Sequence, residues 1–99
     1  MTAPSVHVVA RITAKPGAET AVRELLLTLI EPTRREAGCI SYRLLENLDA
    51  PAEFVFVEEW RDDSAIDAHL ATPHLLHVVT QSQSLLAAAP LILRHRLLS

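Results

Sequence analysis

The chain has 99 residues, 49% of them hydrophobic, and its nine Lys and Arg against twelve Asp and Glu give a net charge of −3. This length suits one domain, residues 1–99, and the scattered basic residues disfavour nucleic acid or an anionic membrane as a partner. We expect a cytoplasmic protein, because the sequence shows no signal peptide and no stretch of ~20 apolar residues that could span a membrane.

The N-terminal third predicts a strand followed by a long helix. Apolar and polar residues alternate over residues 6–13, and residues 15–17, Lys-Pro-Gly, end that pattern. Helical spacing of apolar residues then predicts a helix over 18–37, which Gly38 ends. Pro32 lies inside this helix and lacks an amide hydrogen, so we expect a kink or a restart there.

The middle of the chain predicts a hairpin. Alternation over residues 40–48 indicates a strand that places Ile40, Tyr42 and Leu44 on one face, and residues 47–51 supply the turn. The run 54–57 is apolar on both parities, which favours a strand buried on both faces.

The C-terminal part predicts two helical pieces and a last strand. Asp62, Asp63 and Ser64 are candidate N-caps for a short helix that runs through His69 and Leu70. Thr72 and Pro73 restart a helix that continues to about Leu86, and residues 91–98 read as the fourth strand.

This order of elements predicts an α+β domain with a ferredoxin-like βαββαβ antiparallel sheet. Right-handed crossovers place both helical segments on the same side of that sheet. The opposite face is too apolar to stay uncovered, because it takes alternate residues of 54–57 and of 91–98. We therefore expect a homodimer in which two copies pack sheet to sheet.

Three segments resemble the antibiotic-biosynthesis monooxygenase family, especially its quinol-monooxygenase-like members: residues 36–42, 58–60 and 67–74. The resemblance implies a dimeric α/β barrel with a pocket between the sheet and the helices of each subunit. It also implies that no metal or flavin is used, since some members oxygenate hydroquinones or anthrone-type phenolics without either. Other relatives degrade haem, isomerise small keto compounds or have no assigned activity.

Oxygenation without a cofactor needs an electron-rich substrate, a base, an aromatic wall and a dry pocket. His69 is the candidate base or orienter, because imidazole titrates near neutral pH; its alternative role is to tie the short helix to the sheet. Trp60 is a candidate pocket wall or else a core anchor. Glu58 shares its face and could orient His69, or simply reach solvent or an Arg.

The remaining candidates would contact the substrate. Tyr42 could hydrogen-bond a phenolic oxygen, or it is ordinary strand packing. Phe54, Phe56 and His74 complete the expected substrate-binding set. The trio His69, His74 and His77 suggests a metal, but Pro73 interrupts its helix and no Cys or carboxylate completes a known spacing, so we expect none.

These observations favour a cofactor-independent monooxygenase that oxidises a small hydroquinone or related phenolic with molecular oxygen. An isomerase of a small keto compound is an alternative, in which His69 would move a proton without oxygen. A binding protein for an aromatic metabolite is another. Haem degradation is disfavoured, because haem-degrading relatives use an Asn on the first strand and residues 6–13 contain none.

Overall fold

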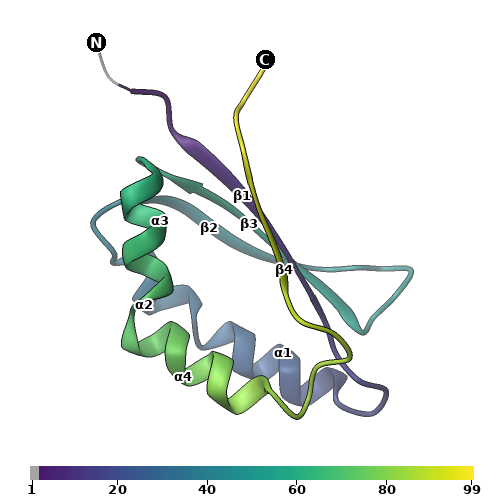
Figure 1. Cartoon of the computed structure of the whole chain (residues 1–99). Coiled ribbons are helices and arrows are strands. Elements are labelled where there is room, and N and C mark those ends of the chain that lie inside the picture. Colours follow the sequence, from purple (N-terminus) through teal and green to yellow (C-terminus); the bar gives the residue numbers. More distant parts are fainter. Residues whose placement is uncertain (1–2) are drawn as a thin grey trace.

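A four-stranded antiparallel sheet carries all the helices on one of its faces (Figure 1). The computed structural model describes residues 3–99, and no helix among them is long and apolar enough to cross a membrane. The strands are β1 (Val6–Thr13), β2 (Cys39–Glu46), β3 (Glu53–Trp60) and β4 (Leu91–His95), and the helices are α1 (Glu19–Leu27), α2 (Ile30–Arg34), α3 (Asp63–Leu70) and α4 (Pro73–Ser82). This arrangement confirms the ferredoxin-like α+β fold predicted from the sequence.

The strand order is β2-β3-β1-β4, so the first and third strands form the centre of the sheet. In their antiparallel register Val8 lies opposite Glu58 and Ala10 lies opposite Phe56. Opposed residues project to the same face, so the even-numbered residues of both strands lie under the helices. The main core forms there, between the central strands and the helical layer.

Burial in β3 alternates, and the prediction of a strand buried on both faces is wrong for the single chain. The four even-numbered side chains are buried, whereas Val55 and Val57 on the other face are only partly buried. Leu45, Leu91 and Leu93 are also about half exposed, at 47%, 50% and 47%. The helices cover one face, and no other part of residues 3–99 covers the second.

The predicted long helix is interrupted one turn before the expected position. The amides of Thr28 and Leu29 bond to the carbonyl oxygens three residues back instead of four. Pro32 has no amide hydrogen to offer the carbonyl of Thr28, so regular helical bonding cannot continue through this point. A five-residue helix follows, and it ends at Arg34 rather than near residue 37.

Two strand predictions also need correction. A register shift between Cys39 and Ser41 leaves Ile40 in a bulge, where it is 56% exposed and does not share the buried face of Tyr42. The last strand ends at His95, which pairs with the second residue of β1, so little of β1 remains to pair with the expected extension to residue 98.

The fourth helix ends at Ser82 instead of near Leu86. Beyond it the backbone turns back to the first strand: the amide of Lys15 donates to the carbonyl of Leu85, and the amide of Ala87 donates to the carbonyl of Thr13. These bonds require an extended chain, so they end the helix before the apolar pattern ends.

The turn before β2 lies against α3, and this close approach prepares the site. Asp62 begins α3 by accepting a hydrogen bond from the amide of Ala65 at 2.9 Å, as its capping pattern predicts. A Cβ atom added to Gly38 would collide with the side chain of Ala65. Glycine at this position therefore lets Glu36, two residues earlier, reach the side chains of the helical layer.

Candidate active site

A cavity of about 320 Å³ lies between the sheet and helices α1, α3 and α4. Most of its lining side chains are aliphatic, among them Val8, Leu26, Ile66, Val79 and Ile92. Its polar lining groups are Tyr42, Glu58, His69 and Ser82. A pocket of this kind, apolar with a few convergent polar groups, is the usual form of a small-molecule site.

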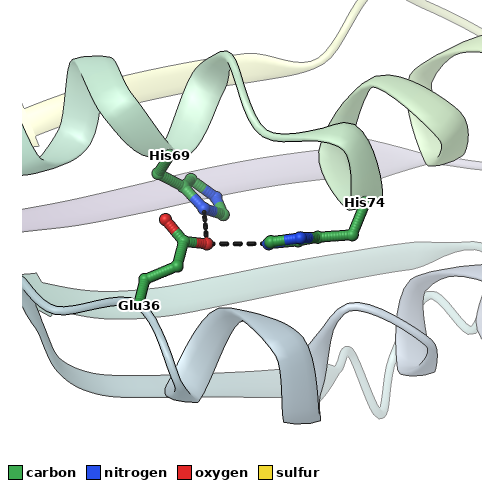
Figure 2. A group of neighbouring side chains, drawn as sticks. All are labelled: Glu36, His69 and His74. Carbon is green, nitrogen blue, oxygen red and sulfur yellow. Dashed lines mark hydrogen bonds and ion pairs between the residues drawn. The ribbon is translucent and has the colours of Figure 1, made fainter.

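His69 projects from α3 into this cavity, and its side chain is 5% exposed. Its Nδ1 atom lies 2.7 Å from Oε2 of Glu36 (Figure 2). An ionised carboxylate only accepts hydrogen bonds, so Nδ1 carries the proton and Nε2 carries the lone pair. No residue among 3–99 bonds to Nε2, which leaves it available to a ligand.

Glu36 is shared between two histidines. Nε2 of His74, at the start of α4, donates to the same Oε2 atom at 2.8 Å, and Figure 2 shows the two rings approaching the carboxylate from different helices. Burial lowers the pKa of His69 below its ordinary value, and His74 adds to this effect while Glu36 opposes it. His69 is therefore neutral at pH 7 and can accept a proton.

Glu58 is a buried carboxyl group in the same cavity, 6% exposed. Its Oε1 accepts a hydrogen bond from Nε1 of Trp60 at 2.8 Å. Burial raises the pKa of Glu58 to about 7; the Trp60 bond opposes this rise and the charge of Glu36 adds to it. The contact with His69 that Glu58 was expected to make is made by Glu36.

Trp60 lies behind the cavity instead of lining it. Its side chain is fully buried, and its ring centre is 4.7 Å from that of His69 at an interplanar angle of 37°. The indole N–H holds Glu58 while the ring packs on His69. Trp60 was expected to form a wall of the pocket, but it supports two polar side chains of the cavity from behind: Glu58 by a hydrogen bond and His69 by ring packing.

The other expected residues divide into two groups. Tyr42 and Phe56 line the cavity and stack on each other with ring centres 4.9 Å apart. Burial raises the pKa of Tyr42, so its hydroxyl stays protonated and can donate. Phe54 is buried further along the strand and His74 lies on the outer side of Glu36, and neither lines the cavity.

Glu36, His69 and His74 are also the one set of potential metal ligands that the described residues bring together, with ligand atoms within 4.8 Å of one another. His77, the third histidine of the trio considered above, is exposed and does not join them. Both nitrogens instead approach a single oxygen at hydrogen-bond distance. The three side chains therefore form a hydrogen-bonded Glu-His-His cluster.

Sequence reasoning missed Glu36 as a functional residue. It is 33 residues from His69 and 38 from His74, so no local spacing connects the three. Its signal was indirect, since Glu36 begins the first of the segments that resemble the monooxygenase family.

Comparison with known proteins gives a consistent result. The profile of the antibiotic biosynthesis monooxygenase family matches residues 5–81, a range that contains Glu36, Glu58 and His69. The chain is 44% identical over 86 residues to "Putative monooxygenase Rv0793" of Mycobacterium tuberculosis, covering 87% of this chain and 83% of that protein.

Solved structures show the same fold. The structure of the Mycobacterium tuberculosis protein superposes with a TM-score of 0.89 at 38% identity and covers 96% of each chain. The protein PA3566 of Pseudomonas aeruginosa gives a TM-score of 0.94 at 32% identity, over 100% of this chain and 99% of that one. The likeness therefore extends over the whole sheet and the helical layer that enclose the cavity.

Proposed function

Because this chain belongs to the antibiotic biosynthesis monooxygenase family, we propose that it is a monooxygenase that oxidises a small hydroquinone or related phenolic with molecular oxygen and without a metal or flavin. One observation carries the proposal: a neutral histidine, held by a carboxylate at 2.7 Å, presents its free nitrogen to an apolar cavity. That arrangement suits removal of a phenolic proton.

In the proposed reaction Nε2 of His69 takes the proton of one hydroxyl group of the bound substrate. Glu36 stabilises the imidazolium that forms, since its carboxylate already accepts the Nδ1 proton. Tyr42, which lines the same cavity, can donate a hydrogen bond to the phenolate oxygen. The ring, now anionic, is electron-rich enough to pass an electron to oxygen.

The electrons balance without a further reductant. After the first transfer the substrate radical and superoxide combine at a ring carbon to form a peroxide, and His69 returns its proton to the outer peroxide oxygen. The O–O bond of the hydroperoxide then breaks as the same ring carbon loses its hydrogen as a proton, which completes the water molecule. One oxygen atom stays in the product and the other leaves as water, so a hydroquinone gives a hydroxyquinone. The aliphatic lining limits water and so protects these intermediates.

We also propose that the active form is a homodimer. The uncovered face of the sheet carries the half-exposed side chains Leu45, Leu91 and Leu93 beside Val55 and Val57. A patch of this kind usually marks a protein interface. A second copy would cover it by packing the same face against itself, as a closed twofold contact requires.

The test is turnover of naphthalene-1,4-diol under ¹⁸O₂, with metal-stripped protein in an oxygen electrode. We expect oxygen uptake matched to substrate loss, and one ¹⁸O atom in each product molecule. An isomerised product formed without oxygen uptake would replace the proposal with the isomerase. Tight binding with no product would replace it with the binding protein.

A further inference from the structure

Besides Tyr42, two ionisable groups line the cavity, and they approach it from opposite layers. His69 enters from α3 in the helical layer, and Glu58 enters from β3 in the sheet. A flat molecule that lies between the layers can therefore contact both groups. Of these two groups the proposed reaction uses only His69, so the role of Glu58 is open.

We infer that this cavity selects uncharged aromatic molecules with two oxygen substituents, and that the carboxyl group of Glu58 donates a hydrogen bond to the oxygen that His69 does not engage. The inference rests on the proposed function for the role of His69. It adds the exclusion of anionic substrates and the residue that contacts the second oxygen.

Exclusion of anions follows from the lining of the cavity. Among residues 3–99 no Lys or Arg lines it. Arg34, at the end of α2, donates to the Tyr42 carbonyl oxygen at 2.9 Å and 3.1 Å. Arg94 on the edge strand is held by Asp63 and Asp67. A carboxylate or phosphate on the substrate would be buried with no positive partner, which is costly.

The surroundings of Glu58 favour its protonated form, which can donate a hydrogen bond. Trp60 donates to Oε1, which fixes the carboxyl group, and no residue among 3–99 bonds to the second oxygen. The ionisable groups that face it in the cavity are Tyr42 from β2 and His69 from α3, both uncharged at pH 7, while α1 and α4 contribute only groups without charge to the lining. Glu36, in the turn before β2, adds a negative charge that further disfavours the carboxylate form of Glu58. No cation among the described residues stabilises its carboxylate form.

The second oxygen therefore meets a neutral acid at pH values below the pKa of Glu58, about 7. A protonated carboxyl group donates strongly to a hydroxyl, ether or carbonyl oxygen, as buried acids do in other enzymes. It also imposes no repulsion on the phenolate that His69 creates. An ionised Glu58 would lose both advantages, because it could only accept hydrogen bonds and would repel an anion.

Anion exclusion is tested by anaerobic calorimetry with three compounds: naphthalene-1,4-diol, its 2-carboxylate and its 2-carboxamide. The carboxamide matches the carboxylate in size but is uncharged. We expect the carboxylate to bind roughly 100-fold more weakly than the other two. Equal binding of carboxylate and carboxamide would overturn the inference. Because no oxygen is present, this outcome is independent of whether the protein turns over its substrate.

The role of Glu58 is tested with 4-methoxy-1-naphthol, whose ether oxygen only accepts hydrogen bonds, against 1-naphthol, which lacks that oxygen. At pH 6 we expect the wild type to bind the methoxy compound roughly tenfold more tightly than 1-naphthol in anaerobic calorimetry, which is the effect of one hydrogen bond in a closed site. Glu58→Leu should lose this preference.

Glu58→Gln separates donation from mere packing, since its amide still accepts from Trp60 and donates from its nitrogen but does not titrate. At pH 8 the wild type should have lost most of its preference for the methoxy compound, and Glu58→Gln should retain it. A preference that is the same in all three proteins, or one that survives at pH 8 in the wild type, would show that Glu58 does not donate to the ligand.

Discussion

The Nδ1 atom of His69 lies 2.7 Å from Oε2 of Glu36, a contact that joins the third helix to the turn before the second strand. It fixes the tautomer of the imidazole ring, and so determines that Nε2 is the basic atom in the cavity. The same oxygen accepts from His74, so the carboxylate is held from two helices. Glu36 is therefore a positioning residue for the proposed base.

Glu36→Gln tests that role. The amide can still accept from Nδ1, but it carries no charge to stabilise the imidazolium, so kcat should fall roughly 10²-fold, within the contribution of a positioned base. Steady-state rates with naphthalene-1,4-diol measure the effect. Glu31→Gln is the control, because Glu31 is exposed and forms a surface ion pair with Arg35 at 3.9 Å. A variant with normal kcat and a raised KM would place Glu36 in substrate binding instead.

His69→Ala should lower kcat by roughly 10²–10⁴ while leaving the fold intact. The loss should be largest for the least acidic phenols, because an acidic hydroquinone ionises with little help. Rates across a series of substituted hydroquinones, with circular dichroism as the control for folding, test this. A defect that is the same for every substrate would mean that His69 positions the substrate or the helix and does not remove the proton.

The parts of this site that local patterns determine could be predicted. Alternation in β3 correctly placed Phe56, Glu58 and Trp60 on one face, because a strand sends every second side chain the same way. The capping residues Asp62 and Thr72 correctly began the two helices that carry the histidines.

The parts that depend on distant contacts could not be predicted. The bond between Glu36 and His69 forms only because Gly38 lets one segment approach another, which no spacing in the sequence reveals. The bulge that exposes Ile40 depends on the register with β3, so the alternation of β2 alone pointed to the wrong face. Neighbouring residues determine which side chains of a strand share a face, whereas the partner of a buried polar side chain can lie far away in the sequence.

The apolar sheet face predicts a dimer at low micromolar concentration, and Leu93→Lys should shift it towards monomer. Leu93 lies on β4 in the uncovered face, so a lysine there would bring two charges into the proposed contact. Sedimentation velocity measures the change. Leu48→Lys is the control, since Leu48 is 92% exposed in the loop after β2. A wild-type monomer with the sheet formed would remove the basis of the dimer proposal.

The hydrogen-bonded assignment of Glu36, His69 and His74 predicts that activity survives a strong chelator. Each histidine already has its partner in Oε2, so removing metal should change neither rate nor stability. Elemental analysis of the purified protein should give far less than one equivalent of zinc or iron. One tightly held equivalent that is lost in His74→Ala would show that the three residues are metal ligands.

The buried carboxyl group of Glu58 predicts a specific dependence of stability on pH. Its pKa is raised from 4.5 to about 7 in the folded protein, so between these values the folded state binds more protons than the unfolded state. Its contribution to the free energy of unfolding is therefore fully present below pH 4.5 and is lost as the pH rises through 7. A shift of this size corresponds to roughly 3 kcal/mol.

Glu58→Gln removes this titration, so the difference in unfolding free energy between the wild type and the variant should change by a few kcal/mol between pH 4.5 and pH 8, in favour of the variant at the higher pH. Urea denaturation at several pH values measures it. Glu59→Gln is the matched control, because Glu59 is the next residue on the strand and its side chain lies on the opposite, partly exposed face, where Ser5 bonds to it at 2.6 Å. If the free energies of unfolding of both variants change with pH as that of the wild type does, Glu58 ionises normally in the folded protein. It then cannot be the neutral acid that donates a hydrogen bond to the second oxygen of the substrate.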